Sequence, residues 1–557
     1  MRYTPACMRQ NLWRFGAAAL SACLLELPFP IAGPMPAWRS FFAWIGLTPL
    51  FIAVLWPFPA GKRAKPLRAG FLIAYGCGFL WYMGNCYWVR DTMMRYGDMP
   101  PFAPTLLLMG FSAVLGLYVG LFGLALMLLR RATGKAVWPL AAAPVLWAAL
   151  ELAAARITSV PWDQLGYSQI DNQLINRLAP WTGVYGISFL LVAVNALMAG
   201  GVVLESRKSR LRSSVAGILV LAAALAGLAV HPAAAPTSAT AVLVQPNLDV
   251  GSDDAWAGAA WGEHMAQFTA LAEETCKQYL AGIPQTAEAQ TIQPDCAAPP
   301  AHPDLVAWPE SPAPSVEQDP RLQSALASVA RATQSPLVVG SIGMEYAPEE
   351  QQWRDYNSAL VIGQDGARVG RYDKIHLVPF GEFVPFKDVL FFARKLTGRV
   401  SEFTRGSERK VFRLNGHRYG AFICYEAVFA DEVRQFAALG AEVLVNISDD
   451  GWYGDTSAPW QHLNMARMRA VENRRWLLRD TNNGITAAID PYGRVVQSIP
   501  RHDVDALPAR YGFRDDITFY TAHSDVFAWA CAILAIGLMG WALSANLRLE
   551  SSIQVRS

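Results

Sequence analysis

Eight apolar runs, each about as long as a membrane-spanning helix, constrain the fold of this chain more than any other feature. A spanning helix needs roughly 20 mostly apolar residues, because the hydrocarbon core is about 30 Å thick and a helix rises about 1.5 Å per residue. The runs cover approximately residues 15–32, 41–58, 69–89, 102–129, 136–155, 183–204, 214–230 and 526–545. The sequence therefore predicts a polytopic α-helical membrane domain of seven helices over residues 1–231, and an eighth spanning helix with a tail over residues 525–557.

The composition agrees with a membrane protein. Charged residues make up 17% of the chain, against about 25% in a typical soluble domain. The formal net charge is +2, so the sequence carries no electrostatic bias toward nucleic acid. We therefore expect the bilayer as a partner, and no nucleic acid.

The first apolar run admits two interpretations. Arg9 and Arg14 give it the charged start of a secretory signal peptide. A series of further runs follows, however, which favours an uncleaved first helix that stays in the membrane.

The distribution of Lys and Arg predicts how the chain is oriented, because cytoplasmic loops carry an excess of these residues. The basic segments precede the first run and follow the second, fourth and sixth. They hold Arg2, Arg9, Arg14, Lys62, Arg63, Lys65, Arg68, Arg130, Arg131, Lys135, Arg207, Lys208, Arg210 and Arg212. Both termini are therefore expected in the cytoplasm, and residues 231–524 on the outer side.

Two polar features of the helical half leave alternatives open. Glu151 lies within the fifth run, where an ionisable group is costly. It either has a functional or paired role, or lies close enough to the helix end to reach water. Trp162 and Tyr167, in the loop that follows, either anchor the protein at the membrane interface or line an access path for lipid.

Between the seventh and eighth runs the pattern changes to short Val- and Ile-rich stretches separated by polar or Ala-rich ones. Strands are expected at 241–244, 305–308, 337–342, 358–362, 419–424, 443–447 and 486–489, and helices at 264–280, 321–333 and 459–476. Turn sequences at 364–366 and 490–493 are typical of hairpins. This spacing favours a layered α/β domain over residues 232–524.

The eight cysteines are too few for a disulfide scaffold in a chain of this length. Cys276 and Cys296 flank a polar stretch and can pair if that stretch faces an oxidising compartment. Spacing alone does not fix the geometry of a disulfide, so this pairing is left open.

Three residues at or just after the ends of expected strands carry chemistry: Glu310, Lys374 and Cys424. Layered α/β folds place their sites at such strand ends. A thiolate is a strong nucleophile, a carboxylate can take the thiol proton, and an ammonium can stabilise an oxyanion. Taken singly, each residue is more often a core thiol or a surface charge, so the hypothesis requires that all three converge.

Several motifs match a known family. Residues 232–524 resemble the nitrilase (carbon–nitrogen hydrolase) superfamily, an αββα sandwich with a Glu-Lys-Cys triad. The chain as a whole resembles the apolipoprotein N-acyltransferases of bacterial envelopes. The matching segments are Trp308-Pro309-Glu310-Ser311, residues 372–382 (YDKIHLVPFGE), Ile423-Cys424-Tyr425-Glu426, residues 461–467 (QHLNMAR) and residues 481–486 (TNNGIT).

The resemblance implies that Glu310 is the general base, Lys374 the oxyanion stabiliser and Cys424 the nucleophile. Glu382 matches a second glutamate that supports the lysine. The supporting or substrate-binding residues that it implies are Glu382, Tyr425, Glu426 and Trp261.

Three points of the match are less regular. Trp256 lies near Trp261, so the assignment of the substrate-contacting tryptophan is less secure. Asp449 stands where the family usually has Asn, and residues 277–303 form a longer polar stretch than usual.

The resemblance also implies a ping-pong reaction. A fatty acyl chain leaves the sn-1 position of a phospholipid, typically phosphatidylethanolamine, and forms a thioester on Cys424. It then passes to the N-terminal α-amine of a diacylglyceryl-cysteine apolipoprotein. No metal or organic cofactor is implied, and the expected location is the bacterial inner membrane with residues 232–524 in the periplasm.

Two other function classes remain. A membrane-tethered carbon–nitrogen hydrolase, or amidase, would use the same triad on a small amide with water as acceptor. A transporter or receptor with an outer sensing domain would use no chemistry at all.

The apolar segment 389–392 either dips into lipid or packs as a helix.

Overall fold

The computed structural model describes residues 5–58, 66–97, 100, 102–250, 260–280, 302–310, 316–383 and 402–556. The chain divides into two compact units. The first, called the helical unit, comprises Met1–Arg90, Pro100–His231 and Asp525–Ser557. The second, called the sheet unit, comprises Asp91–Met99 and Pro232–Ser524.

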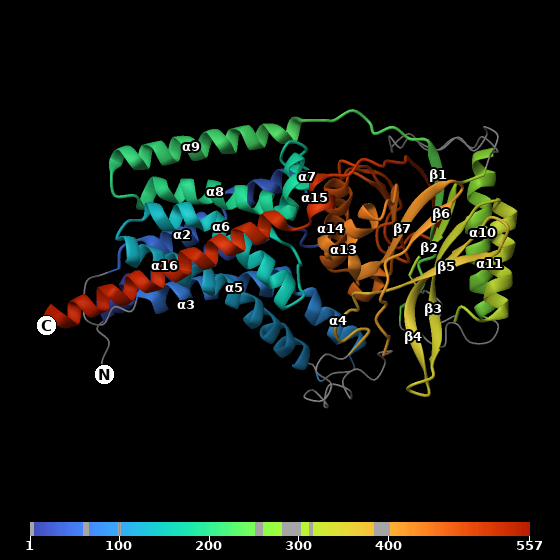
Figure 1. The fold of residues 1–557 in the computed structure, drawn as a ribbon, viewed down its shortest axis with the longest axis horizontal. Helices are drawn as coiled ribbons and strands as arrows, with labels where there is room; N and C mark the ends of the chain where they lie inside the picture. The colour runs from blue at the N-terminus through green and yellow to red at the C-terminus, as the bar shows by residue number, and fades with distance from the viewer. Residues whose placement is uncertain are drawn as a thin grey trace. The chain divides into compact units, whose positions relative to one another are not determined.

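The helical unit consists of helices and short connections (Figure 1). Its α-helices are α1 (Pro5–Glu26), α2 (Thr48–Leu55), α3 (Pro66–Asn85), α5 (Ala103–Thr133), α6 (Val137–Ile157), α7 (Ala179–Thr182), α8 (Val184–Val203), α9 (Arg207–Ala226) and α16 (Val526–Arg556). Its 3-10 helices are η1 (Ala37–Trp44), η2 (Leu165–Gln169), η3 (Ile175–Leu178) and η4 (Gly227–Ala229). Helix α4 (Trp88–Tyr96) begins in the helical unit and ends in residues that cluster with the sheet unit.

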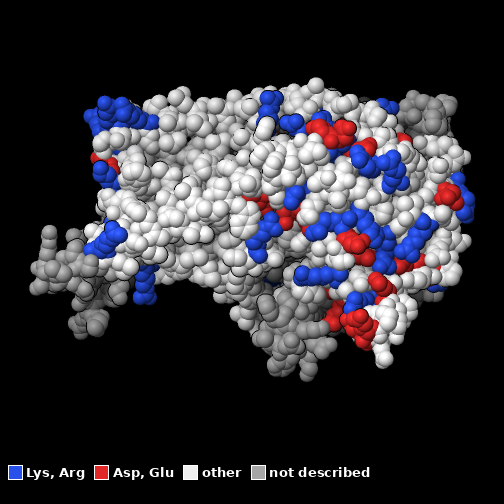
Figure 2. Space-filling view, in the orientation of Figure 1, with Lys and Arg blue, Asp and Glu red and all other residues white. Residues whose placement is uncertain are grey.

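Six helical stretches of the described residues are long and apolar enough to cross a membrane. They are Ala37–Leu55, Ala103–Thr133, Val137–Ile157, Val184–Val203, Arg207–Ala229 and Val526–Leu549. Figure 2 shows Lys and Arg side chains gathered at one end of the helical unit, beside a broad face without charged side chains. These features are those of a multi-pass membrane protein. Helices α1 and α3 occupy the first and third expected runs but are not among these six stretches. The total of eight spans therefore stays a prediction.

A contact of Arg14 bears on the first apolar run. The Arg14 side chain is 2% exposed, and its guanidinium donates to the carbonyl oxygens of Ala53 (2.5 Å), Trp56 (3.2 Å) and Pro57 (2.9 Å). It thereby satisfies carbonyls at the C-terminus of α2 that have no partner within the helix. This contact favours the interpretation of α1 as a permanent member of the helical unit.

Small residues let α3 and α5 approach closely. A Cβ atom added at Gly123 would lie 2.4 Å from the carbonyl oxygen of Gly70, and one added at Gly78 would lie 2.7 Å from Val119. Close approach of this kind is the common basis of helix packing in membranes, where van der Waals contact replaces the hydrophobic effect.

The sheet unit contains two six-stranded sheets. The first has the order β12-β1-β2-β3-β4-β5, and the second the order β11-β10-β9-β8-β7-β6. The strands are β1 (Ala239–Gln245), β2 (Leu305–Trp308), β3 (Leu337–Ala347), β4 (Gln352–Ile362), β5 (Arg368–Asp373), β6 (Val411–Leu414), β7 (His417–Ile423), β8 (Val443–Ser448), β9 (Trp476–Thr481), β10 (Ala487–Ile489), β11 (Val495–Ser498) and β12 (Asp505–Tyr511). Strands β1, β2 and β3 are parallel, as are β7, β8 and β9, and the outer pairs are antiparallel.

Helices cover the outer faces of the two sheets (Figure 1). α10 (Ala260–Leu280) and α11 (Pro320–Thr333) pack on the first sheet in a core that includes Phe268, Trp308 and Leu326. α13 (Ala430–Ala438) and α14 (Ala458–Asn473) contact strands of the second sheet, and the facing strands β1 and β9 contact each other. The layers are therefore helix, sheet, sheet and helix, as expected for an αββα sandwich. α15 (Phe519–His523), η6 (Cys424–Val428) and η7 (Asp450–Tyr453) complete the described elements of this unit.

The expected strands and helices all occur, with several ends shifted. Thr486 lies outside β10, and β3 and β4 are longer than expected. Cys424 begins η6 and is not the last residue of a strand, since β7 ends at Ile423. The helix expected to reach Trp476 ends at Asn473, because Arg474 takes a left-handed conformation (φ 50°) and Trp476 begins β9. Both hairpin turns are confirmed by the antiparallel pairs β4–β5 and β10–β11.

Candidate active site

A buried ammonium group lies between two carboxylates in the sheet unit. Lys374 follows β5, and its Nζ donates to Oε1 of Glu310, after β2, and to Oε1 of Glu382, at 2.9 Å each. Asn357 on β4 donates its Nδ2 to the same two oxygens, at 2.7 and 2.6 Å. Burial disfavours the charged lysine, but the two carboxylates outweigh it and hold the pKa of Lys374 well above its ordinary range. The site therefore keeps a permanent cation.

The remaining carboxylate oxygens of this cluster are fixed by backbone. Oε2 of Glu310 accepts from the amide N–H of Asp449 (2.9 Å), directly after β8. Oε2 of Glu382 accepts from the N–H of Val378 (2.7 Å). Each glutamate therefore has one oxygen toward the lysine and one held by the chain, so its orientation is set before any substrate arrives.

Cys424 follows β7 in an unusual backbone conformation. Its φ of 48° lies in the left-handed region, which non-glycine residues occupy rarely, and its side chain is 4% exposed. Burial and the Glu310 charge raise the pKa of the Cys424 thiol well above its ordinary range, and the Lys374 charge opposes them. The thiol is thus within electrostatic reach of both predicted partners. At rest it carries its proton.

Glu426 links the lysine segment to the cysteine segment. Its Oε1 accepts from the Tyr372 hydroxyl (2.7 Å) and from the Ile375 amide (2.7 Å), and its Oε2 accepts from the Ile423 amide (2.8 Å). The residue is fully buried, and burial raises the pKa of its carboxyl against the effect of these donors. One carboxyl group therefore fixes the residues beside Lys374 relative to those beside Cys424.

A second buried network holds the main chain at the cysteine. Nε2 of His462 on α14 donates to the carbonyl oxygen of Cys424 (3.0 Å), since that oxygen can only accept. Nδ1 of His462 lies 2.9 Å from Asp450, and Arg479 on β9 donates to Asp450 at 2.7 Å. Burial favours a neutral Asp450, but Arg479 and His462 outweigh it and lower the pKa of that carboxyl. This histidine contacts backbone, which gives it a positioning role here.

The pKa of the Asp449 carboxyl is shifted in the opposite direction to that of Asp450. Its side chain is 6% exposed and accepts from Gly451 N (3.0 Å) and Asn482 Nδ2 (3.2 Å). Burial and the nearby charge of Glu310 raise the pKa of Asp449 to about 8. At neutral pH this carboxyl is therefore mostly protonated and uncharged.

The structure brings some of the predicted residues together and leaves others untested. Glu310, Lys374 and Glu382 share hydrogen bonds, and Glu426 joins the residues beside Lys374 to those beside Cys424. Cys424 lies within electrostatic range of Glu310 and Lys374. The Tyr425 ring packs edge-on against Phe429. Trp261 packs against the core under the guanidinium of Arg321, so its contact with substrate stays a prediction. Cys296, the side chain of Cys276, residues 389–392 and Trp256 lie outside what the structure describes.

Sequence reasoning missed several residues of the site. Asn357, His462 and Arg479 lie at the site without being among the predicted side chains. Tyr453 also lies at the site, because its ring packs edge-on against that of His462, with 6.1 Å between the ring centroids. His462 lies inside the matched motif at residues 461–467, so the sequence could have indicated it. Asn357 lies in no matched motif. Among the described residues, no group of three or more His, Cys, Asp or Glu side chains is arranged to hold a metal ion.

Two family models match this chain. The model for carbon-nitrogen hydrolases matches residues 242–504, and the model for the apolipoprotein N-acyltransferase N-terminal domain matches residues 21–197. Among solved structures, Nit3 of Saccharomyces cerevisiae aligns with 53% of this chain and 97% of its own, at 17% identity and a TM-score of 0.35. An amidase from Nesterenkonia aligns with 54% and 98% respectively, at 18% identity and a TM-score of 0.36.

The αββα sandwich, with its cysteine, lysine and glutamate at strand ends, defines an enzyme of the carbon–nitrogen hydrolase class. Curated relatives are more specific. The chain is 33% identical over 525 residues to the apolipoprotein N-acyltransferase of Geobacter metallireducens, covering 92% of each chain. It is 32% identical over 528 residues to that of Pseudomonas putida, covering 92% of this chain and 95% of the relative. The chain belongs to the apolipoprotein N-acyltransferase family.

Proposed function

We propose that this enzyme moves a fatty acyl group from the sn-1 ester of a phospholipid, typically phosphatidylethanolamine, to the α-amine of an N-terminal diacylglyceryl-cysteine, through a thioester on Cys424. The observation that carries the proposal is the Lys374 ammonium held between Glu310 and Glu382, with the Cys424 thiol in electrostatic reach. The six apolar helices hold the enzyme in the membrane, where both substrates reside.

The first half-reaction loads the enzyme. Glu310 takes the proton of the Cys424 thiol while the sulfur attacks the ester carbonyl, and a tetrahedral oxyanion forms. The Lys374 ammonium and the N–H of Tyr425 stabilise that oxyanion. The C–O bond to the glycerol then breaks, the leaving oxygen takes the proton from Glu310, and a lysophospholipid departs.

The second half-reaction transfers the acyl group. The neutral α-amine of the diacylglyceryl-cysteine attacks the thioester carbonyl, with Lys374 and the Tyr425 N–H again at the oxyanion. Glu310 accepts a proton from the amine, the C–S bond breaks, and that proton returns to the sulfur. The product is an amide-linked, triacylated lipoprotein, and the enzyme regains its thiol.

The raised pKa of Cys424 supports a role for Glu310 as base. A buried thiol that keeps its proton at rest needs a proton acceptor at the moment of attack. Glu310 qualifies because one oxygen is bonded to Lys374 and Asn357 and the other to a backbone N–H, so its position is fixed. A protonated resting thiol also limits oxidation and unproductive reactions.

The location follows from the substrates. Both are anchored by acyl chains, and each buried CH₂ contributes about 0.8 kcal/mol to that anchoring. The enzyme therefore acts at a bilayer surface, which we assign to the outer face of the bacterial inner membrane. The alternating basic loops favour cytoplasmic termini and a periplasmic sheet unit.

Mass spectrometry of the purified enzyme tests the thioester. After incubation with phosphatidylethanolamine carrying a labelled sn-1 chain, we expect a labelled acyl adduct on Cys424 that neutral hydroxylamine removes. Cys424→Ala abolishes the adduct, whereas Cys23→Ser, at an exposed free cysteine, keeps it. A labelled adduct that survives in Cys424→Ala would refute the assignment.

The acceptor separates the transferase from an amidase. Adding a diacylglyceryl-cysteine peptide to the loaded enzyme should discharge the thioester into an N-acylated peptide faster than water does. Discharge that yields free fatty acid at the same rate with and without peptide would support the hydrolase instead.

A further inference from the structure

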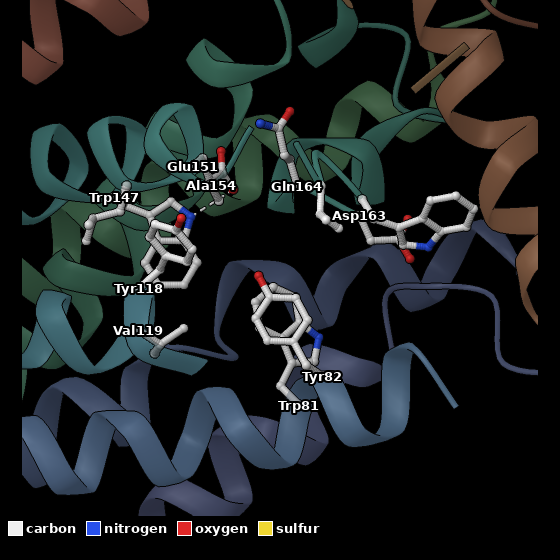
Figure 3. A pocket seen from close by; sticks show the side chains of 12 residues that line it. Trp81, Tyr82, Tyr118, Val119, Trp147, Glu151, Ala154, Asp163 and Gln164 are labelled. Atoms are coloured by element: carbon white, nitrogen blue, oxygen red, sulfur yellow. Dashed lines mark hydrogen bonds between the residues drawn. The ribbon is translucent and has the colours of Figure 1, made fainter. Parts of the chain in front are cut away.

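The helical unit contains a pocket that the proposed reaction does not use. It is lined by residues of α3, α5 and α6 and of the loop after α6, among them Tyr82, Tyr118, Glu151 and Asp163. In Figure 3 the Glu151 side chain and the Tyr82 ring lie on opposite sides of the pocket, and Asp163 lies on a third. The free volume for a water-sized group is about 30 Å³, enough for one or two such groups.

The lining is acidic. It holds the carboxyl groups of Glu151 and Asp163, and none of the lining residues is Lys, Arg or His. Oε1 of Glu151 accepts from the Trp147 indole (2.9 Å) and from the Leu165 amide (2.8 Å). These neutral donors hold the carboxyl group in place without balancing its charge.

Asp163 leaves one oxygen without a protein partner. The residue is 2% exposed, and its Oδ2 accepts from Asn85 (3.0 Å) while its Oδ1 has no hydrogen-bond partner among the described residues. A buried carboxyl oxygen left in this way is costly unless a ligand satisfies it. The acid Glu26 lies within electrostatic range of Asp163 and also interacts with Arg39.

Aromatic rings form much of the remaining lining. Trp81 stacks on Tyr82 at 5.0 Å between ring centroids and on Trp147 at 6.5 Å, and Tyr118 and Trp162 complete the aromatic set. The faces of such rings attract cations, most strongly where water is excluded. Carboxyl oxygens and ring faces together favour a small organic cation over a neutral group.

We propose that this pocket binds the primary ammonium group of a lipid substrate. The ethanolamine headgroup of the phospholipid donor and the α-amine of the lipoprotein acceptor both carry that group, so the proposal rests on the proposed function. An –NH₃⁺ group has about the size of a water molecule and three donors, which match the Asp163 and Glu151 oxygens. A trimethylammonium group has no N–H donor to offer these oxygens.

Lipid binding to a non-reacting enzyme tests the site apart from the chemistry. Native mass spectrometry of the full-length Cys424→Ala protein, titrated with phosphatidylethanolamine, phosphatidylglycerol and phosphatidylcholine, should show preferential retention of the first. Asp163→Asn and Glu151→Gln should each reduce that preference about tenfold. Glu205→Gln, at an exposed acid of the same unit, should leave it unchanged. Equal retention of the three lipids in the parent protein would mean that the pocket holds water only, and would overturn the proposal.

Kinetics identify which ammonium is bound. If the pocket takes the donor headgroup, both variants raise the KM for phosphatidylethanolamine about tenfold, leave kcat within twofold, and do not affect phosphatidylglycerol. If it takes the acceptor amine, the KM for the lipopeptide rises with either donor. Equal effects on all substrates, in variants that insert into the membrane and fold correctly, would refute the site. If Cys424→Ala retains phosphatidylethanolamine selectively but the protein with Cys424 forms no acyl thioester, the proposed function is refuted and the ammonium site stands.

Discussion

Replacing Asp449 by Asn should change how the stability of the sheet unit depends on pH. The Asp449 carboxyl is buried beside Glu310, which raises its pKa from 3.8 to about 8. In the unfolded chain the group ionises near its ordinary value. Its contribution to stability is therefore fully present below about pH 4 and is lost as the pH rises through about 8.

The size of the effect follows from this shift. Each pH unit between the two pKa values lowers the free energy of unfolding by about 1.4 kcal/mol for this one group. Between pH 5 and pH 8 the loss is about 4 kcal/mol, or roughly 8 °C in the unfolding temperature of a unit this large. The amide side chain of the Asp449→Asn variant does not titrate. It keeps the Gly451 hydrogen bond and loses the one from Asn482, at a cost of about 1 kcal/mol.

The assay is thermal unfolding of the parent and Asp449→Asn proteins in detergent at half-unit steps from pH 5 to pH 8.5. We expect the variant to be similar or slightly less stable at pH 5, and clearly more stable at pH 8. Asp455→Asn, at an exposed carboxyl paired with His502, should give no slope of that sign. Parallel unfolding curves for parent and Asp449→Asn across this range would refute the reasoning.

Further outcomes follow from the same contacts. Glu426→Gln should slow thioester formation by 10-fold or more, because it disturbs the hydrogen bonds that join the Lys374 and Cys424 segments. The rate is measured from the burst of labelled acyl-enzyme, and a rate within twofold of the parent would contradict this prediction. Tyr372→Phe removes one of those bonds and should slow the burst less, with a loss of about 1 kcal/mol in stability. Gly123→Leu should lower the amount of folded protein recovered from membranes, measured by fluorescence-detected gel filtration, because α3 and α5 cannot approach. Glu151→Gln should raise the unfolding temperature without lipid, because it removes an ionisable group from the membrane unit.

The framework of the sheet unit could be predicted because its central strands are short, apolar and bounded by turn residues. β9 departs from that rule. It carries the buried residues Arg479 and Asp480, so an apolar count does not find it. The end of α14 was missed for a related reason: the left-handed residue there is Arg474, and no Gly or Pro marks the stop.

The site was predictable where chemistry-bearing residues fall at strand ends inside motifs. Glu310 and Cys424 follow strands with apolar ends, whereas Lys374 follows the polar strand β5. Glu310 and Lys374 belong to one sheet and Cys424 to the other. Asn357 lies inside β4, in the same sheet as β2 and β5, and reaches the carboxylates across that sheet. The sequence indicated the acidic pocket of the helical unit only through Glu151, a single glutamate in an apolar run. Asp163 lies in the following loop, and only the folded structure brings it to the same pocket.

The hydrogen bond from His462 to the Cys424 carbonyl oxygen has a consequence for the amide N–H of Tyr425. The peptide between residues 424 and 425 is planar, and its C=O and N–H point in opposite directions. An imidazole that binds the oxygen on one side therefore directs the Tyr425 N–H to the other side, and the proposed mechanism uses that N–H as an oxyanion donor. In the proposed mechanism this histidine therefore orients a peptide dipole beside Cys424, and Glu310 is the group that moves protons.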